Sequence, residues 1–260
     1  AQLYDLQFSP DGKTIYGAGG ESLGSTDQHG WAWAWDTESG RLRWKKPFLE
    51  SLCTVQVSPR GAILLTRSEK WNLALQETTT GKLRCRLEER RASNEESRAR
   101  NIAGNLYFTP DEKRVMGCFT EGIQIWNTRT GKREAFWWLP KGDYGVPHNL
   151  EFSADGTKVM VTVSGWSSKK RHDPHDSACV YLRDSKTGRV LRKFPGPYSI
   201  SALSPAADKI TMVGDRYYSS DAGYRLVLYS GRPGILKRES PRVASDFLPV
   251  SLDFRPDGNI

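Results

Sequence analysis

The sequence lacks long apolar runs and is poor in cysteine, and these two absences exclude several classes of protein. No stretch approaches the roughly 18 consecutive apolar residues that a membrane-spanning helix needs, so we expect no membrane partner. The 4 cysteines lie at least 32 residues apart, at Cys53, Cys85, Cys118 and Cys179. That spacing fits neither a Cys-x-x-Cys metal site nor a small disulfide-bonded fold, so we expect buried thiols.

The motifs of common enzymes are also missing. The chain contains no G-x-S-x-G, H-E-x-x-H, P-loop or dinucleotide-binding pattern, and its 4 histidines suggest no catalytic triad. His172 and His175 lie beside two aspartates, but Pro174 separates them and no third His or Cys is near, so a solvated loop is favoured over a metal site. We therefore predict no enzymatic activity, no catalytic residue, no metal and no cofactor.

Charge of one sign is not concentrated in any segment. The chain has 38 Lys and Arg against 30 Asp and Glu, a net charge of +8, but the basic residues are spread along its whole length. The segment 84–100 carries six Arg and four Glu, which compensate one another. A nucleic-acid partner is therefore not expected. Strongly salt-dependent retention on DNA would be the evidence for nucleic-acid binding.

What the sequence does contain is a repeat of about fifty residues. Six segments share an apolar residue, a turn opened by a small or polar residue and, in most copies, Pro and Gly, as in Pro10, Asp11 and Gly12. We name these SPDG turns. Their apolar anchors lie 44 to 51 residues apart, at Phe8, Val57, Phe108, Phe152, Leu203 and Phe254.

A second turn occurs once inside each complete repeat. In the first copy, WDTESG, Asp36 can accept hydrogen bonds from the turn backbone, and the final glycine supplies the positive φ that tight turns often require. We name these TG turns, and their glycines are Gly40, Gly81, Gly131, Gly188 and Gly234. Alternating apolar residues on both sides of each turn predict short strands.

Each repeat therefore reads strand, SPDG turn, strand, loop, strand, TG turn, strand, loop. This pattern predicts an all-β fold, a β-propeller of four-stranded antiparallel blades with five complete repeats and the start of a sixth. We expect one domain over residues 1–260, with repeats at about 3–51, 52–102, 103–146, 147–197 and 198–248, and a partial repeat at 249–260. The chain opens at Ala1 without an initiator Met, so we expect an excerpt of a longer propeller, in a compartment that the sequence does not reveal beyond a preference for the cytoplasm.

The paired marks, FSPDGK followed by WDTESG and their degenerate copies, resemble the bacterial type of WD-repeat β-propeller over almost the whole chain. Only Trp35 and Asp36 form a true Trp-Asp pair. Kelch repeats fit less well, because their Gly-Gly doublet occurs once, at Gly19 and Gly20. The resemblance implies a non-catalytic scaffold for protein–protein interaction; the alternative is the propeller domain of an enzyme, either a quinoprotein-like dehydrogenase, which WDTESGRLRW resembles, or one whose catalytic domain lies outside this excerpt.

Length variation is confined to the second-to-third-strand loops and the connections between repeats, which emerge at one end of each blade. We name this end the loop side and the end with the fixed turns the turn side. Variable loops often carry binding, so we predict that the loop side binds another protein or a peptide, with acidic chemistry as the natural complement. The candidate contact residues are aromatic or basic: Trp138, Tyr144, Trp166, Lys169, Lys170, Arg171, Tyr217 and Tyr218.

The strand WAWAW, residues 31–35, places three tryptophans on one face of the first blade. Such a stripe could stack nucleobases or sugars. Blade faces are covered by neighbouring blades, however, so we expect these tryptophans to pack in the core.

Overall fold

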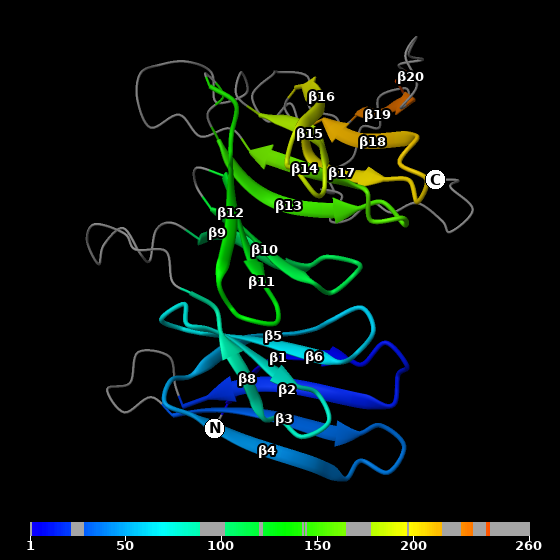
Figure 1. Cartoon of the computed structure of the whole chain (residues 1–260). Coiled ribbons are helices and arrows are strands. Elements are labelled where there is room, and N and C mark those ends of the chain that lie inside the picture. The colour runs from blue at the N-terminus through cyan, green and yellow to red at the C-terminus, as the bar shows by residue number, and fades with distance from the viewer. Residues whose placement is uncertain are drawn as a thin grey trace. The chain divides into compact units, whose positions relative to one another are not determined.

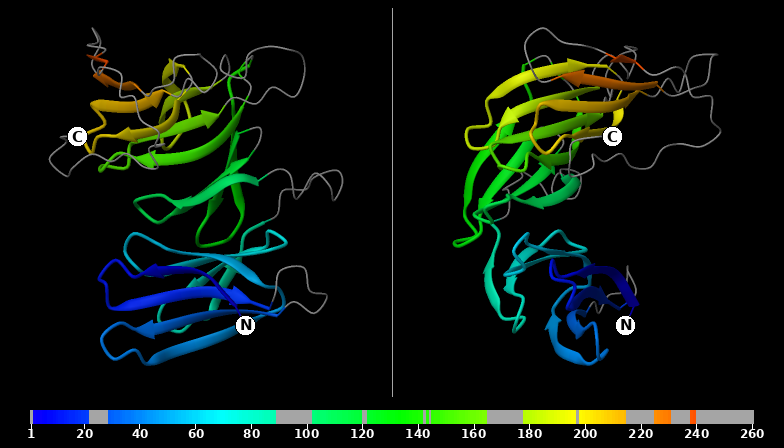
Figure 2. Two further views of the ribbon diagram at one scale, coloured as in Figure 1. Left: turned by 180° about the vertical axis from the view of Figure 1, so that it is seen from behind. Right: turned by 90° about the vertical axis from the view of Figure 1, so that its right-hand side faces the viewer.

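The computed structural model describes residues 2–21, 29–88, 102–119, 122–141, 143, 145–164, 178–196, 198–214, 225–230 and 238–239. These ranges hold strands and turns and no helix, so none of them contains a helix able to cross a membrane. The strands form five sheets, shown in Figure 1 and from two further directions in Figure 2.

Each sheet consists of four strands that follow one another along the chain and pair with their sequence neighbours. Sheet 1 contains β1 (Gln2–Phe8), β2 (Thr14–Gly20), β3 (Gly30–Asp36) and β4 (Leu42–Phe48). Sheet 2 contains β5 (Leu52–Val57), β6 (Ile63–Ser68), β7 (Leu73–Glu77) and β8 (Leu83–Arg86). Sheet 3 contains β9 (Ile102–Phe108), β10 (Arg114–Phe119), β11 (Gly122–Asn127) and β12 (Arg133–Trp138).

The last two sheets have the same plan. Sheet 4 contains β13 (Val146–Phe152), β14 (Lys158–Ser164), β15 (Cys179–Asp184) and β16 (Val190–Pro195). Sheet 5 contains β17 (Tyr198–Leu203), β18 (Lys209–Gly214), β19 (Arg225–Ser230) and β20 (Arg238–Glu239). The predicted all-β class, with repeated four-stranded antiparallel sheets, is confirmed.

The chain forms two compact units. The first comprises residues 1–99, 111–115 and 125–135, and the second comprises residues 100–110, 116–124 and 136–260. Sheets 1 and 2 belong to the first unit and sheets 4 and 5 to the second, while the strands of sheet 3 are divided between them. A single domain over the whole chain stays a prediction.

Strand register brings the loop ends of a sheet together. In sheet 1, Gln2 pairs with Gly20, Gly20 with Gly30 and Gly30 with Phe48, so the second-to-third-strand loop and the connection to sheet 2 leave from the same end. Sheet 4 repeats this arrangement, with Val146 opposite Ser164.

The serine of the SPDG turn explains why that motif recurs. The Ser9 hydroxyl donates to the Asp11 carboxylate at 2.6 Å and accepts from the Thr14 amide at 2.9 Å, which closes the turn around two side chains. The Lys13 amide also donates to Asp11, at 3.1 Å. The equivalent serine accepts from the amide five residues later in three other sheets, at Ser58, Ser153 and Ser204.

The fourth residue of the SPDG turn has a left-handed backbone even where it is not glycine. Gly12 has φ 69° and Gly156 has φ 68°, a region that glycine enters without steric cost. Glu112 (φ 59°) and Ala207 (φ 53°) occupy the same place in sheets 3 and 5 and adopt the same conformation. The turn geometry is therefore retained in degenerate copies, although a residue with a Cβ pays a steric free-energy cost in the left-handed conformation.

The TG turn is closed by its first side chain and tied to the SPDG turn by its second. Asp36 accepts from the Ser39 amide at 2.8 Å, as a turn-opening aspartate does. The Thr37 hydroxyl donates to the carbonyl of Gly12 at 2.8 Å, which joins the two turns of sheet 1. The same threonine-to-carbonyl bond recurs in sheets 2 and 3, from Thr78 to Gly61 and from Thr128 to Glu112.

Sheet 1 packs one face on sheet 2 through small and medium apolar side chains. The buried cluster combines Tyr16, Ala18, Ala32 and Ala34 of sheet 1 with Leu52, Val55, Val57 and Leu64 of sheet 2. Polar side chains also link the first strands, because the Asp5 carboxylate accepts from the Val55 amide at 2.9 Å. Sheets 4 and 5 share a similar cluster, which includes Met160, Phe194, Ile210 and Met212.

The tryptophans of β3 do not lie in that interface. Ala32 and Ala34 are fully buried against sheet 2, whereas the indoles project from the opposite face and are partly exposed: Trp31, Trp33 and Trp35. The expectation that they pack in the core is wrong, because alternation defines two faces and the alanine face allows the closer approach of a neighbouring sheet. The indoles pack on one another, with the centroids of Trp33 and Trp35 at 5.9 Å.

The SPDG turn of sheet 4 makes a prediction about acid stability. The Ser153 hydroxyl and the amide and hydroxyl of Thr157 donate to Asp155, which lowers the pKa of its carboxyl from 3.8 to about 2. A lowered folded-state pKa stabilises the protein above pH 3.8, and that contribution is lost as the pH falls toward 2. We expect Asp155→Asn to reduce the slope of unfolding free energy against pH between those values, measured by urea unfolding.

The control for this prediction is Glu38→Gln. Glu38 accepts no hydrogen bond from the described residues, so its removal should leave that slope nearer to that of the parent. An unchanged slope for Asp155→Asn would contradict the assigned role of the turn.

Candidate functional site

The structure describes one of the contact residues that the sequence predicts for the loop side. Trp138 is the last residue of β12. The other candidates lie outside the described residues: Tyr144, Trp166, Lys169, Lys170, Arg171, Tyr217 and Tyr218. Of the predicted turn residues, Gly234 also lies outside them, whereas Pro10, Asp11, Gly12, Asp36, Gly40, Gly81, Gly131 and Gly188 are described.

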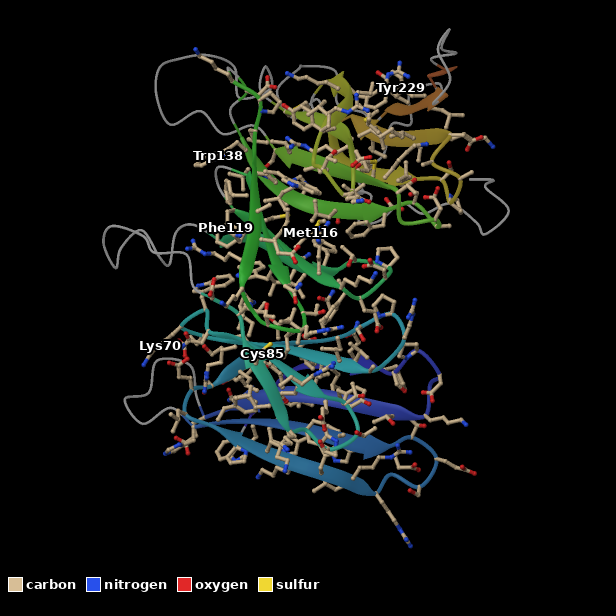
Figure 3. All side chains as sticks on the ribbon, in the orientation of Figure 1. Lys70, Cys85, Met116, Phe119, Trp138 and Tyr229 are labelled. Carbon is tan, nitrogen blue, oxygen red and sulfur yellow. The ribbon has the colours of Figure 1, made fainter. Side chains whose placement is uncertain are left out.

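Trp138 presents a large aromatic surface to solvent. Trp138 is 60% exposed, although it lies at the end of a strand of a packed sheet (Figure 3). The ring of Phe136 meets the indole edge to face, with centroids 4.6 Å apart. The indole thus rests on a second aromatic ring while most of the residue stays exposed, an arrangement suited to contact with a partner.

A buried arginine fixes the backbone beneath this indole. Arg183 of β15 is 3% exposed and donates from Nη2 to the carbonyl oxygen of Trp138 at 3.1 Å. Its Nη1 donates to the carbonyl of Gly188 at 3.2 Å, and its guanidinium lies 5.3 Å from the centroid of the Tyr181 ring. Burial lowers the pKa of Arg183, and no carboxylate among the described residues pairs with it. The Arg183 guanidinium therefore holds the end of β12 in place through its hydrogen bonds to backbone carbonyls.

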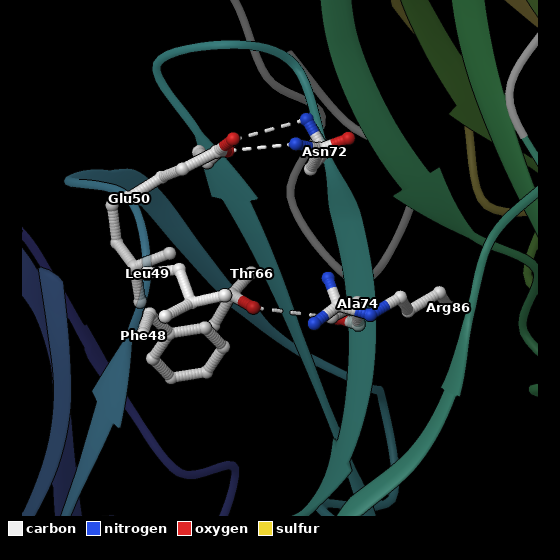
Figure 4. Close-up of a pocket in the computed structure, with 9 residues that line it drawn as sticks. Phe48, Leu49, Glu50, Thr66, Asn72, Ala74 and Arg86 are labelled. Carbon is white, nitrogen blue, oxygen red and sulfur yellow. Dashed lines mark hydrogen bonds between the residues drawn. The ribbon is translucent and has the colours of Figure 1, made fainter.

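A pocket of about 240 Å³ lies at the loop side of the first unit, between the end of β4 and sheet 2 (Figure 4). Leu52 begins β5 and pairs with Ser68, the last residue of β6, so the pocket sits where these strands meet the loops. Its lining residues are Phe48, Leu49, Glu50, Leu52, Thr66, Ser68, Asn72, Ala74 and Arg86.

The carboxylate of Glu50 is the most firmly held polar group of the pocket. The hydroxyl of Ser68 donates to Oε2 at 2.5 Å and the amide nitrogen of Asn72 donates to the same oxygen at 2.7 Å (Figure 4). Ser68 Oγ in turn accepts from the backbone amide of Asn72 at 3.1 Å. Both donors are neutral, so they orient the carboxylate without cancelling its charge.

The loop that supplies Asn72 has an unusual backbone. Trp71 has φ 66°, a left-handed conformation that is a true outlier for so large a side chain. The hairpin is closed around it, because the Trp71 amide donates to the carbonyl of Ser68 at 3.0 Å. The indole stacks on Arg67, whose guanidinium carbon lies 4.1 Å from the ring centroid. Strain of this kind is common where a loop must present a group precisely, here the amide of Asn72.

The metal-ligating and thiol groups of the described residues have simple surroundings. Among the described residues, no group of three or more His, Cys, Asp or Glu is placed to hold a metal ion. Burial raises the pKa of the Cys118 thiol to about 12, so this cysteine stays protonated at neutral pH. The remaining thiols, whose pKa values burial also raises, are Cys53, Cys85 and Cys179.

Sequence reasoning missed the pocket residues. Glu50 lies in a short connection, and Ser68 and Asn72 flank a hairpin tip of three residues, all of ordinary polar composition. The one available signal was that this tip, EKW, joins two strands without any glycine, which requires a non-glycine residue to take the left-handed position.

Comparisons with known proteins identify the fold. No family model matches the chain, and no curated protein matches its sequence. Hydrazine synthase of Kuenenia stuttgartiensis superposes with a TM-score of 0.64 at 15% identity, over 98% of this chain and 71% of that one. A chain of the mitotic checkpoint complex crystal structure superposes with a TM-score of 0.63 at 13% identity, over 98% and 72%.

Both of these structures contain β-propellers. The fold is a β-propeller. At these identities the likeness shows the fold alone, and one neighbour is titled as an enzyme while the other is titled as a multiprotein complex. The function of this propeller must therefore be argued from its own surface.

Proposed function

We propose that this β-propeller is a non-catalytic scaffold of the WD-repeat kind, which binds another protein through its loop side. The observation that carries the proposal is the exposure of Trp138 at the end of β12. Tryptophan is the residue type most enriched among interface hot spots, because it buries a large area at little entropic cost.

A second exposed apolar side chain occupies the same topological place in the first unit. Leu49, 83% exposed, directly follows β4 just as Trp138 ends β12, so both lie where the outer strand of a sheet leads into the next connection. Loops positioned by a rigid scaffold often carry binding residues, and these two apolar side chains are the ones that the described connections offer for contact with a partner.

The test compares Trp138→Ala with Leu191→Ala in the full chain. Leu191 is a suitable control, because it is 40% exposed in β16 of the same unit but lies near the TG turn, at the turn side. Each protein would be used to capture partners from a lysate of the source organism, and the affinity for the main partner would then be measured. Trp138→Ala should raise the dissociation constant at least about tenfold, as loss of a hot spot does.

Leu191→Ala should bind like the parent, and the melting temperatures of all three proteins should be compared first. The proposal fails if Trp138→Ala, correctly folded, retains the same partner with the same affinity, or if no protein is captured specifically by the parent.

A further inference from the structure

The pocket of the first unit contains two charged side chains, Glu50 and Arg86, and the carboxylate of Glu50 is paired with neither Arg86 nor any other described cation. No Lys, Arg or His among the described residues forms an ion pair with Glu50. Its Oε2 accepts from Ser68 and Asn72, whereas its Oε1 accepts no hydrogen bond from these residues. A carboxylate oriented in advance, with one oxygen open, is a receptor for a cation.

The rest of the lining suits a long side chain that carries its charge at the tip. Phe48 is partly buried and Leu49 is an exposed apolar residue at the rim (Figure 4). Leu52 and Ala74 also line the pocket, as buried apolar side chains. The methylene stems of lysine and arginine bury well along such surface while the head group finds its partner. The volume of about 240 Å³ is below the range of roughly 300 to 1,000 Å³ in which drug-sized ligands are bound, and it suits a single side chain.

From these features we infer that the pocket receives one basic side chain, lysine or arginine, of the partner protein, with its charged group on Glu50. This inference rests on the proposed function and gives it a chemical specificity. The strained backbone at Trp71 contributes to this pocket, because it places the side-chain amide of Asn72, which orients the Glu50 carboxylate.

The effect of Arg86 on binding would differ between a basic ligand and an acidic one. Its side chain lines the same pocket, is exposed, and pairs with no described carboxylate. A basic ligand is repelled weakly by Arg86, because solvent and salt screen an exposed charge. An acidic ligand, or a peptide carboxylate, would instead depend on Arg86 for binding.

The test uses blocked single residues as probes on the full chain. Nα-acetyl-lysine methylamide and Nα-acetyl-arginine methylamide would be titrated beside the norleucine and glutamate equivalents, with binding followed through the methyl NMR signals of Leu49, Leu52 and Ala74. The lysine or arginine probe should saturate with a dissociation constant on the order of 1 mM, and the norleucine and glutamate probes should not. Raising the salt concentration should weaken binding of the basic probe.

The variants are Glu50→Gln and Arg86→Gln, with Arg84→Gln as a control that removes a charge from the same strand outside the pocket. Glu50→Gln keeps an oxygen for Ser68 and Asn72 but should raise the dissociation constant at least about tenfold. Arg86→Gln should lower it, and Arg84→Gln should change it less than Arg86→Gln does. Equal binding of norleucine, no effect of Glu50→Gln, or loss of binding in Arg86→Gln would each overturn the inference.

Two further readouts keep the test decisive. If Glu50→Gln lowers the melting temperature, the salt dependence of the parent decides the question, since binding of the basic probe that is indifferent to salt excludes an ion pair with Glu50. If a partner is captured through Trp138 but no basic probe binds, the pocket inference fails while the scaffold function stands. If a probe binds but no partner is captured, the scaffold proposal fails while the pocket keeps its ligand class.

Discussion

Replacing Gly131 with alanine is expected to lower the free energy of unfolding by more than about 3 kcal/mol, whereas Gly40→Ala should cost about 1 to 2 kcal/mol. Both glycines close TG turns with nearly the same backbone, at φ 72° and φ 67°. A Cβ at Gly40 would meet nothing within 4 Å. A Cβ at Gly131 would lie 2.1 Å from the carbonyl oxygen of Arg86, a distance that only a shift of backbone can relieve.

Urea unfolding of the parent and the two variants measures this difference directly. The pair separates two costs that the sequence motif combines: the left-handed conformation, which both positions share, and the close approach of a neighbouring strand, which only Gly131 has. Equal losses would show that the TG glycine serves its own turn alone. A loss at Gly40 larger than that at Gly131 would contradict the packing of this turn on β8.

This contrast shows where sequence reasoning stops. The motif of polar opener and closing glycine predicts the turn, because both act within six residues of chain. It does not reveal that Gly81 and Gly188 also face the outer strand of another sheet, where a Cβ would lie 2.8 Å from the ring of Trp44 and 2.4 Å from the indole nitrogen of Trp137. Such contacts join residues 37 to 51 positions apart, and no local pattern encodes them.

The strands and turns could be predicted from the sequence because they depend on interactions between residues close together in the chain. Alternation of apolar residues gives a strand, and the Ser9 and Asp36 side chains close their turns on nearby backbone. The pocket was not predictable, because its charge balance depends on which of many polar residues meet. Glu50 comes from a connection after sheet 1, and Asn72 comes from a hairpin tip of sheet 2 that is set by the backbone of Trp71.

The tryptophans show a second limit of sequence-based prediction: alternation does not reveal which of the two faces of a strand is buried. Trp35 and Trp126 occupy the same place in their repeats, immediately before the first residue of the TG turn. Trp126 is 2% exposed and its indole nitrogen donates to the carbonyl of Glu88 at 2.9 Å, whereas Trp35 is only partly buried. Period-two alternation places both indoles on a sheet face but does not say whether another sheet covers it.

We therefore expect Trp126→Ala to reduce the free energy of unfolding by about 3 to 5 kcal/mol, through lost apolar burial, a residual cavity and an unpaired carbonyl at Glu88. Trp35→Ala should cost less than half as much, because part of its surface already faces water. Urea unfolding of both variants gives the comparison. Comparable losses at the two positions would mean that the tryptophan face of sheet 1 is covered in solution as fully as that of sheet 3, and would contradict the partial exposure of Trp35 on which this prediction depends.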